Sequence, residues 1–269
     1  KEHGYTLVHG FDDYSVMAGQ GTIGLEILED MPEINTVIVP IGGGGLITGI
    51  STLAKMLNPK IKVIGVEPAA AASMTAAFEK GEPVTLPSAN TIADGTAVKR
   101  VGETIFPYCK ENIHKIITVD DNELIGAFLD MVENHKMIVE NSGLLPVAAL
   151  SHLDLKDKKA VVVLSGGNMD VITMSSIVQH GLIQKDRIFS VSVLLPDKAG
   201  ELVKVASIIA KEKGNVIKLE HNQFVSINRI NAVELRVTME AYGTEHKFSI
   251  LKALEEAGFE PKVVDTKLY

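Results

Sequence analysis

The residues best suited to do chemistry are four consecutive glycines at a point where a strand gives way to a helix. They follow a short β-branched run over residues 36–41 and precede apolar residues at helical spacing over 46–57. Glycine lets the backbone approach a ligand closely, and a helix N-terminus offers free N–H groups and a positive dipole end. The pattern predicts a loop that binds a phosphate-bearing ligand. The four glycines are Gly42, Gly43, Gly44 and Gly45.

Three other interpretations of this loop can be weighed on the residues alone. A P-loop has Lys and then Ser or Thr after its last glycine, whereas Leu46 and Ile47 stand here. A Rossmann loop for a dinucleotide would use Glu67, at the end of the next strand, to hold a ribose, but the G-x-G-x-x-G spacing fails from every start. A simple tight turn is the third alternative, although four glycines exceed what a turn requires.

The elements around the loop place a second glycine turn on the same side of the fold. Residues 165–168, Ser-Gly-Gly-Asn, end another apolar strand, and the carboxyl ends of parallel strands form the ligand-binding rim of open α/β sheets. The polar loop 91–95 is either part of this composite site or a surface connection. The patterns predict strands over 5–9, 36–41, 61–66, 113–119 and 160–164, and helices from 22 onward and over 46–57, 69–80, 120–132 and 144–153.

Composition sets outer limits on the function. With 269 residues and 46% hydrophobic residues, the chain can form more than one globular domain. The net charge of −8 and the lack of a Lys/Arg cluster argue against nucleic acid or an acidic membrane as partner. No apolar run is long enough to span a membrane, and the scattered histidines give no zinc-ligand spacing. The single Cys109 cannot form an internal disulfide, which favours a cytoplasmic location.

Five motifs, in order and in register, resemble the threonine dehydratase family. They are QGT at 20–22, GGGGL at 42–46, VEP at 66–68, IADG at 92–95 and LSGGN at 164–168. That family belongs to the fold-type II enzymes that use pyridoxal 5'-phosphate (PLP). The resemblance implies that residues 1–185 are the C-terminal part of a PLP-dependent catalytic domain of α/β class, a parallel sheet with helices.

The resemblance also implies roles for particular residues. The glycine loop, including Leu46, would cradle the cofactor phosphate, and Ser165 would bond the pyridine nitrogen. Because a hydroxyl does not hold that nitrogen protonated, the ring would be a weaker electron sink, which favours loss of a β-hydroxyl group. Glu140 would lie near the cofactor ring. From the residues alone, Ser165 could instead bond backbone at a strand end, and Glu140 could be a surface charge beside a helix.

Two departures from the family concern a cation and the catalytic lysine. Relatives that bind a divalent cation use a glutamate at the position of Glu67, the backbone carbonyl at the position of Ala71, and an acid at position 73. This chain has Ser73 there. The family's Ser-Phe-Lys-x-Arg-Gly motif, which holds the Schiff-base lysine, is absent, as is its Ser/Thr-Ser-Gly-Asn-His loop. Both precede this region in the family, so we expect an inactive fragment of a larger domain.

The pattern changes over residues 187–269. Residues 189–195 alternate as in a half-exposed strand, and the order of elements predicts a βαββαβ, ferredoxin-like domain of α+β class. One cysteine cannot hold an iron–sulfur cluster. The Pro-Asp-x-x-Gly-Glu-Leu turn at 196–202 resembles ACT domains, regulatory modules that bind amino acids between paired copies. The resemblance places Gly200 and Asn215 at the effector site, although Asn215 could simply serve the turn after Gly214.

Together the resemblances imply a threonine ammonia-lyase, which converts L-threonine to 2-oxobutanoate and ammonia. A branched-chain amino acid, isoleucine or valine, would control it in a homo-oligomer, a dimer or a tetramer, because 2-oxobutanoate feeds isoleucine biosynthesis in the family. A serine dehydratase or racemase acting on L-serine is the near alternative. A non-catalytic module that senses amino acids is the alternative from another class.

Overall fold

The computed structural model describes residue 4 and residues 8–156, 158–222 and 233–266. The chain divides into two compact units, Lys1–Ser175 and Ser176–Tyr269. The division falls within α7 (Val171–Gln184), a helix that we did not predict, rather than at the expected border near residue 186. The strand predicted at 5–9 lies mostly outside the described residues, and Val8 and His9 are not in a strand.

The first unit is built on a four-stranded parallel sheet with the strand order β3-β2-β1-β4. In the register of the central strands, Thr36 lies opposite both Lys62 and Ala160. Every residue of β1 is buried, as expected for a parallel sheet that is covered on both faces. The strands are β1 (Thr36–Pro40), β2 (Lys62–Pro68), β3 (Ile113–Val119) and β4 (Ala160–Val162).

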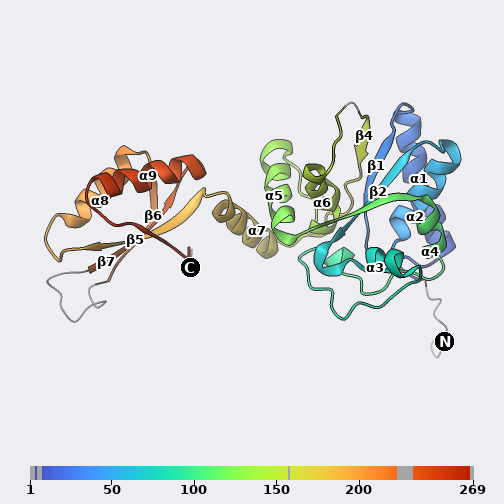
Figure 1. The fold of residues 1–269 in the computed structure, drawn as a ribbon, viewed down its shortest axis with the longest axis horizontal. Helices are drawn as coiled ribbons and strands as arrows, with labels where there is room; N and C mark the ends of the chain where they lie inside the picture. Colours follow the sequence, from blue (N-terminus) through green and yellow to red (C-terminus); the bar gives the residue numbers. More distant parts are fainter. Residues whose placement is uncertain (1–3, 5–7, 157, 223–232, 267–269) are drawn as a thin grey trace. The chain divides into compact units, whose positions relative to one another are not determined.

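Helices cover both faces of this sheet. In Figure 1, α1, α2 and α4 lie on one side of the strands, and α5 and α6 lie on the other. Ile47, Ile50 and Ala54 of α2 join the sheet's apolar residues in the core. The helices are α1 (Tyr14–Asp30), α2 (Gly45–Leu57), α3 (Ser73–Lys80), α4 (Phe106–Asn112), α5 (Asp121–Asp130) and α6 (Asn141–Ala148), with short helical turns at Ala69–Ala71, Asp94–Thr96, Met131–His135 and Ala149–His152.

Helix α1 begins eight residues earlier than the apolar spacing predicted. Its N-cap is Asp13, whose carboxylate accepts hydrogen bonds from the N–H groups of Ser15 at 2.7 Å and Val16 at 3.3 Å. The helix then crosses α2 so closely that a Cβ added to Gly49 would lie 2.3 Å from the carbonyl oxygen of Met17. On the α1 side this contact is made largely by backbone atoms of Met17 and Gly21, which a search for apolar side chains does not detect.

The alanine-rich helix predicted over 69–80 is also wrong in its extent, since it is split before Ser73. The cause is Glu67, whose carboxylate accepts hydrogen bonds from Met74 N at 2.6 Å, Thr75 N at 2.8 Å and Thr75 Oγ1 at 2.7 Å. These groups are the free donors of a helix N-terminus. A side chain from β2 therefore caps α3 and decides where it begins.

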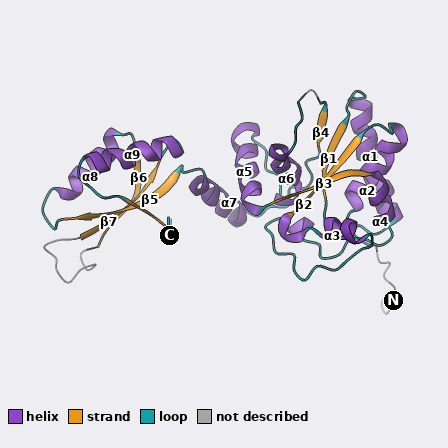
Figure 2. Ribbon diagram, viewed as in Figure 1, coloured by secondary structure: helices purple, strands orange, loops and turns teal. Residues whose placement is uncertain are grey.

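The second unit has an antiparallel sheet with the order β6-β7-β5-β8, and α8 and α9 cover one face of it (Figure 2). This confirms the predicted βαββαβ arrangement. Ser190, expected on the exposed face of its strand, is buried in the central strand and shares a 2.8 Å hydrogen bond with Thr238. The elements are β5 (Ile188–Leu195), α8 (Glu201–Lys211), β6 (Asn215–Asn222), β7 (Val233–Glu240), α9 (Thr244–Glu256) and β8 (Lys262–Val264). The irregular stretch expected at 224–230 lies outside the described residues.

Candidate active site

The four glycines form the turn between β1 and α2, as expected. Gly44, with φ of +103°, precedes the first residue of α2. Neighbours pack directly against the loop, since a Cβ on Gly43 would lie 2.3 Å from the ring of Phe11 and one on Gly42 would lie 3.0 Å from Cα of Thr96. Among the described residues, the N–H groups of 42–45 donate to no side chain and no loop carbonyl. The loop therefore presents free donors to an anion.

Leu46 and Ser165, the other two residues expected at the cofactor, occupy different surroundings. Leu46 is the second residue of α2, and its side chain packs against the apolar core. Only its backbone can therefore face a bound anion. Ser165 is half-buried just beyond β4, and its hydroxyl makes no hydrogen bond to any other described residue. The hydroxyl is free to bond a ligand.

The second glycine turn wraps around Glu140. The Asn168 N–H donates to Glu140 Oε2 at 3.1 Å, and the Glu140 N–H donates to the carbonyl of Gly166 at 3.3 Å. Gly166 has φ of +81°, and a Cβ there would lie 2.3 Å from the carboxyl carbon of Glu140. Glu140 is half-buried and is therefore a component of the rim rather than a solvated surface charge.

The loop at 92–95 joins the two glycine turns. Its next residue, Thr96, donates its N–H to Ser142 Oγ at 3.1 Å, and the Asn141 side-chain amide donates to the Ile92 carbonyl at 2.9 Å. A Cβ on Gly95 would lie 3.3 Å from Glu140 Oε1. The structure thus brings together the glycine loop, this loop and the second turn, which lie up to 126 residues apart in the chain.

A cavity of about 400 Å³ opens where the loop at 92–95 meets Glu140 and the second glycine turn. Asn141 Oδ1 is buried beside it and accepts no hydrogen bond from any described residue. A buried acceptor without a donor is costly, so this atom is a position at which a ligand donor would be stabilising. We did not predict Asn141 or Ser142, although two polar residues at the start of an apolar helix were a visible signal. The lining includes Asp94, Gly95, Glu140, Ser142, Asn168 and Thr173.

Of the predicted cation ligands, Glu67 serves as the cap of α3. Glu67 is fully buried, and both of its carboxylate oxygens accept hydrogen bonds from α3. Burial raises the pKa of Glu67, and the hydrogen bonds from Thr75 and Met74 oppose that shift. Ala71 and Ser73 are buried nearby, and the described residues contain no cluster of three or more potential His, Cys, Asp or Glu ligands. The arrangement fits a helix cap better than a cation site.

In the second unit, the two predicted effector residues lie at opposite ends of α8. Gly200 precedes this helix of 11 residues and Asn215 follows it, which separates them by roughly 16 Å at 1.5 Å per residue. Asn215 donates to Glu240 Oε2 at 2.8 Å and lines a cavity of about 500 Å³ with Arg187, Lys213 and Tyr242. Gly200 does not line this cavity, so one copy cannot bring both residues to the same small ligand.

Comparison with known proteins agrees with this geometry. The family model for pyridoxal-phosphate dependent enzymes matches residues 1–166. The chain is 40% identical over 261 residues to the L-threonine ammonia-lyase of Geobacter sulfurreducens, which covers 96% of this chain and 65% of that protein. It also resembles threonine deaminase isoform 2 of Solanum lycopersicum, with a TM-score of 0.63, 37% identity, and coverage of 66% of this chain and 53% of that one.

Maize serine racemase has a similar structure, with a TM-score of 0.61, 35% identity, and coverage of 68% of this chain and 57% of that one. This chain spans just under two thirds of the curated relative and little more than half of each solved structure. Among the residues that the structure describes, no helix is long and apolar enough to cross a membrane.

Proposed function

Because the chain belongs to the pyridoxal-phosphate-dependent enzyme family, we propose that its first unit supplies the phosphate-binding and ring-binding part of a PLP site. The observation that carries this proposal is the meeting of the glycine loop, the loop at 92–96 and the second glycine turn beside Glu140. When bound, PLP supplies an electron sink for charge that develops at the α-carbon of an amino acid.

The residues of this chain fit that cofactor. The free N–H groups of the glycine loop suit a phosphate dianion at a helix N-terminus. The unengaged hydroxyl of Ser165 would bond the ring nitrogen without holding it protonated. Glu140 would stand beside the ring, with its carboxylate oriented by the N–H of Asn168. The unpaired Asn141 Oδ1 would accept a donor from the bound molecule.

The reaction we propose for the whole protein is the conversion of L-threonine to 2-oxobutanoate and ammonia. The similarity to threonine ammonia-lyase over 96% of this chain supports it. The similarity to maize serine racemase supports L-serine as the alternative substrate. The 269 residues contain no Ser-Phe-Lys-x-Arg-Gly motif, so we propose that they bind PLP without a covalent link and do not turn over threonine alone.

Titration of the chain with PLP, followed by absorbance and by equilibrium dialysis, tests this function. We expect saturable binding that Ser165→Ala weakens, whereas Ser151→Ala, an exposed serine of the same unit, leaves it unchanged. Borohydride reduction should attach no pyridoxyl group to a specific lysine. Specific labelling together with threonine turnover would show that the catalytic lysine is present after all, and absence of binding would rule out the PLP site.

We further propose that the second unit binds a branched-chain amino acid between two copies of the chain. The positions of Gly200 and Asn215 support this, because antiparallel pairing of two β6 edge strands would place Gly200 of one copy near Asn215 of the other. Strand β6 is exposed along its length and carries the outward-facing apolar residues Val216, Ile217 and Leu219.

Calorimetric titration of isoleucine, valine and threonine into the chain tests this regulation. Binding should require a dimer and should be lost in Asn215→Ala, while Asn134→Ala in the first unit retains it. If wild-type protein binds none of the three amino acids, the effector site is wrong and the second unit is better explained as an assembly domain.

A further inference from the structure

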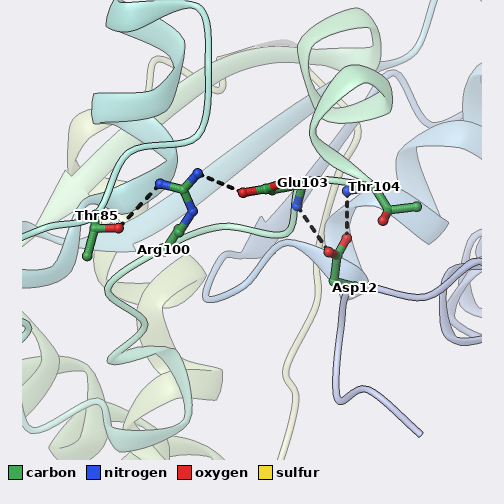
Figure 3. A network of polar contacts seen from close by, with 5 residues as sticks. All are labelled: Asp12, Thr85, Arg100, Glu103 and Thr104. Carbon is green, nitrogen blue, oxygen red and sulfur yellow. Dashed lines mark hydrogen bonds and ion pairs between the residues drawn. The ribbon is translucent and has the colours of Figure 1, made fainter.

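The carboxylate of Asp12 accepts hydrogen bonds from three consecutive backbone N–H groups. Oδ2 accepts from Glu103 N at 3.1 Å, and Oδ1 accepts from Thr104 N at 2.9 Å and from Ile105 N at 3.2 Å. Figure 3 shows the bonds of Asp12 to Glu103 and Thr104, together with Arg100, which bonds to Thr85 and Glu103. Hydrogen bonds from N–H groups to an ionised carboxylate are stronger than bonds between neutral groups. Asp12 therefore clamps this segment, which lies more than 90 residues away in sequence.

The clamped segment in turn holds the glycine loop. The N–H of Gly102 donates to the carbonyl of Gly43 at 3.1 Å. In a trans peptide the C=O and the following N–H point in opposite directions, so this bond fixes the direction of the Gly44 N–H. Gly102 can make the contact because it lacks a side chain, since a Cβ there would lie 2.5 Å from Asp12 Oδ1.

The glycine loop is enclosed by Phe11, which is next to Asp12, and by the clamped segment 102–105. The ring of Phe11, the neighbour of Asp12, packs on Gly43, and its backbone packs on Gly45, where a Cβ would lie 2.9 Å away. Ile105, at the end of the clamped segment, packs against Gly44, where a Cβ would lie 2.9 Å from Ile105 Cδ1. Anchoring Asp12 therefore places both Phe11 and Ile105 against the loop. The exposed Arg100–Glu103 ion pair adds little by comparison.

We propose that Asp12 is a positioning residue for the phosphate cradle, an inference that rests on the PLP function proposed above. Its carboxylate fixes residues 102–105, these fix the Gly43–Gly44 peptide, and that peptide directs one N–H donor at the phosphate. Asp12 touches neither the cofactor nor the substrate. Without the clamp this peptide can rotate, and the loop loses affinity for a phosphate group and not for the remainder of the ligand.

The experiment compares the dissociation constants of PLP and of pyridoxal, which lacks the phosphate, for the full chain. Asp12→Ala should lower the preference for PLP over pyridoxal by about tenfold, as expected for the loss of one hydrogen bond to a charged group. Asp12→Asn, whose amide oxygen can still accept from Thr104 and Ile105, should restore part of it. Asp13→Ala is the matched control, because this adjacent acid caps α1 and does not contact 102–105. Its preference should equal that of the wild type.

The outcomes separate the two proposals. If the wild type binds PLP no better than pyridoxal, the loop is not a phosphate cradle and the proposed function fails with it. If the wild type prefers PLP and Asp12→Ala retains the full preference, the cradle stands and the role of Asp12 is overturned. A loss of affinity for both ligands by the same factor would also overturn it, because that pattern indicates general damage. If circular dichroism shows that Asp12→Ala does not fold, the preference measured for Asp12→Asn decides the question.

Discussion

At the scale of single residues, the buried Cys109 makes stability depend on pH. Its Sγ lies 2.8 Å from Thr48 Oγ1, and burial raises its pKa from 9.0 to about 12. Between these values the folded state holds the thiol proton more tightly than the unfolded state does. The stabilisation is complete below pH 9 and is lost as pH rises toward 12, at up to about 1.4 kcal/mol per pH unit.

The measurement is urea unfolding of the wild type and of Cys109→Ala at pH 8, 9 and 10. The wild-type free energy of unfolding should fall more steeply with pH than that of the variant, in which this group is missing. Iodoacetamide at pH 8 should label Cys109 only when urea is present. Labelling of the native protein at the rate of the unfolded chain would contradict a buried, protonated thiol.

The second residue-scale prediction concerns Glu67. Because Glu67 caps α3, Glu67→Ala should lower the free energy of unfolding by about 1–3 kcal/mol, since N–H donors of the helix are left without an acceptor. Glu79→Ala, on the exposed end of the same helix, should have little effect. Addition of EDTA should leave the Tm of the wild type unchanged. A fall in Tm with EDTA that Glu67→Ala abolishes would instead indicate a bound cation.

At the scale of elements, the contact between α1 and α2 gives different surroundings to Gly49 and Gly19, two helical glycines that the sequence does not distinguish. Gly49 faces the backbone of α1, and a Cβ there would lie 2.3 Å from Met17 O, whereas nothing lies within 4 Å of a Cβ on Gly19. Gly49→Ala should therefore destabilise the protein by about 1–3 kcal/mol. Gly19→Ala should stabilise it by about 0.4–1 kcal/mol, because alanine loses less backbone entropy in a helix. Thermal unfolding of the two variants checks the opposite signs.

At the scale of the whole molecule, each unit has its own apolar core. The core of the second unit includes Val191, Val193, Val205 and Ile250, all of which lie within Ser176–Tyr269. We expect residues 176–269, expressed alone, to unfold cooperatively in urea, as small domains with one core do. The transition should match one of those seen in the full chain. A fragment that has no cooperative transition would show that its core depends on the first unit.

Much of the fold could be predicted because it depends on local patterns in the sequence. Continuous apolar runs located β1 and β2, and the acidic first turn at 120–123 located the start of α5. The structure adds that Asp120 and Glu123 form a reciprocal capping pair there. The glycine turns at the ends of two apolar strands were visible as candidate binding loops. In such cases a residue's type and its near neighbours decide its conformation, so the sequence suffices.

Only the tertiary structure decided which distant groups meet. Nothing near Asp12 in the chain reveals that its partners are the N–H groups of 103–105, and nothing near Glu67 shows that its carboxylate begins α3. The early start of α1 and the opposite positions of Gly200 and Asn215 were equally hidden. Periodicity reports which face of an element is buried. The partner of a buried polar group is set by how the elements pack, and that is a property of the folded chain.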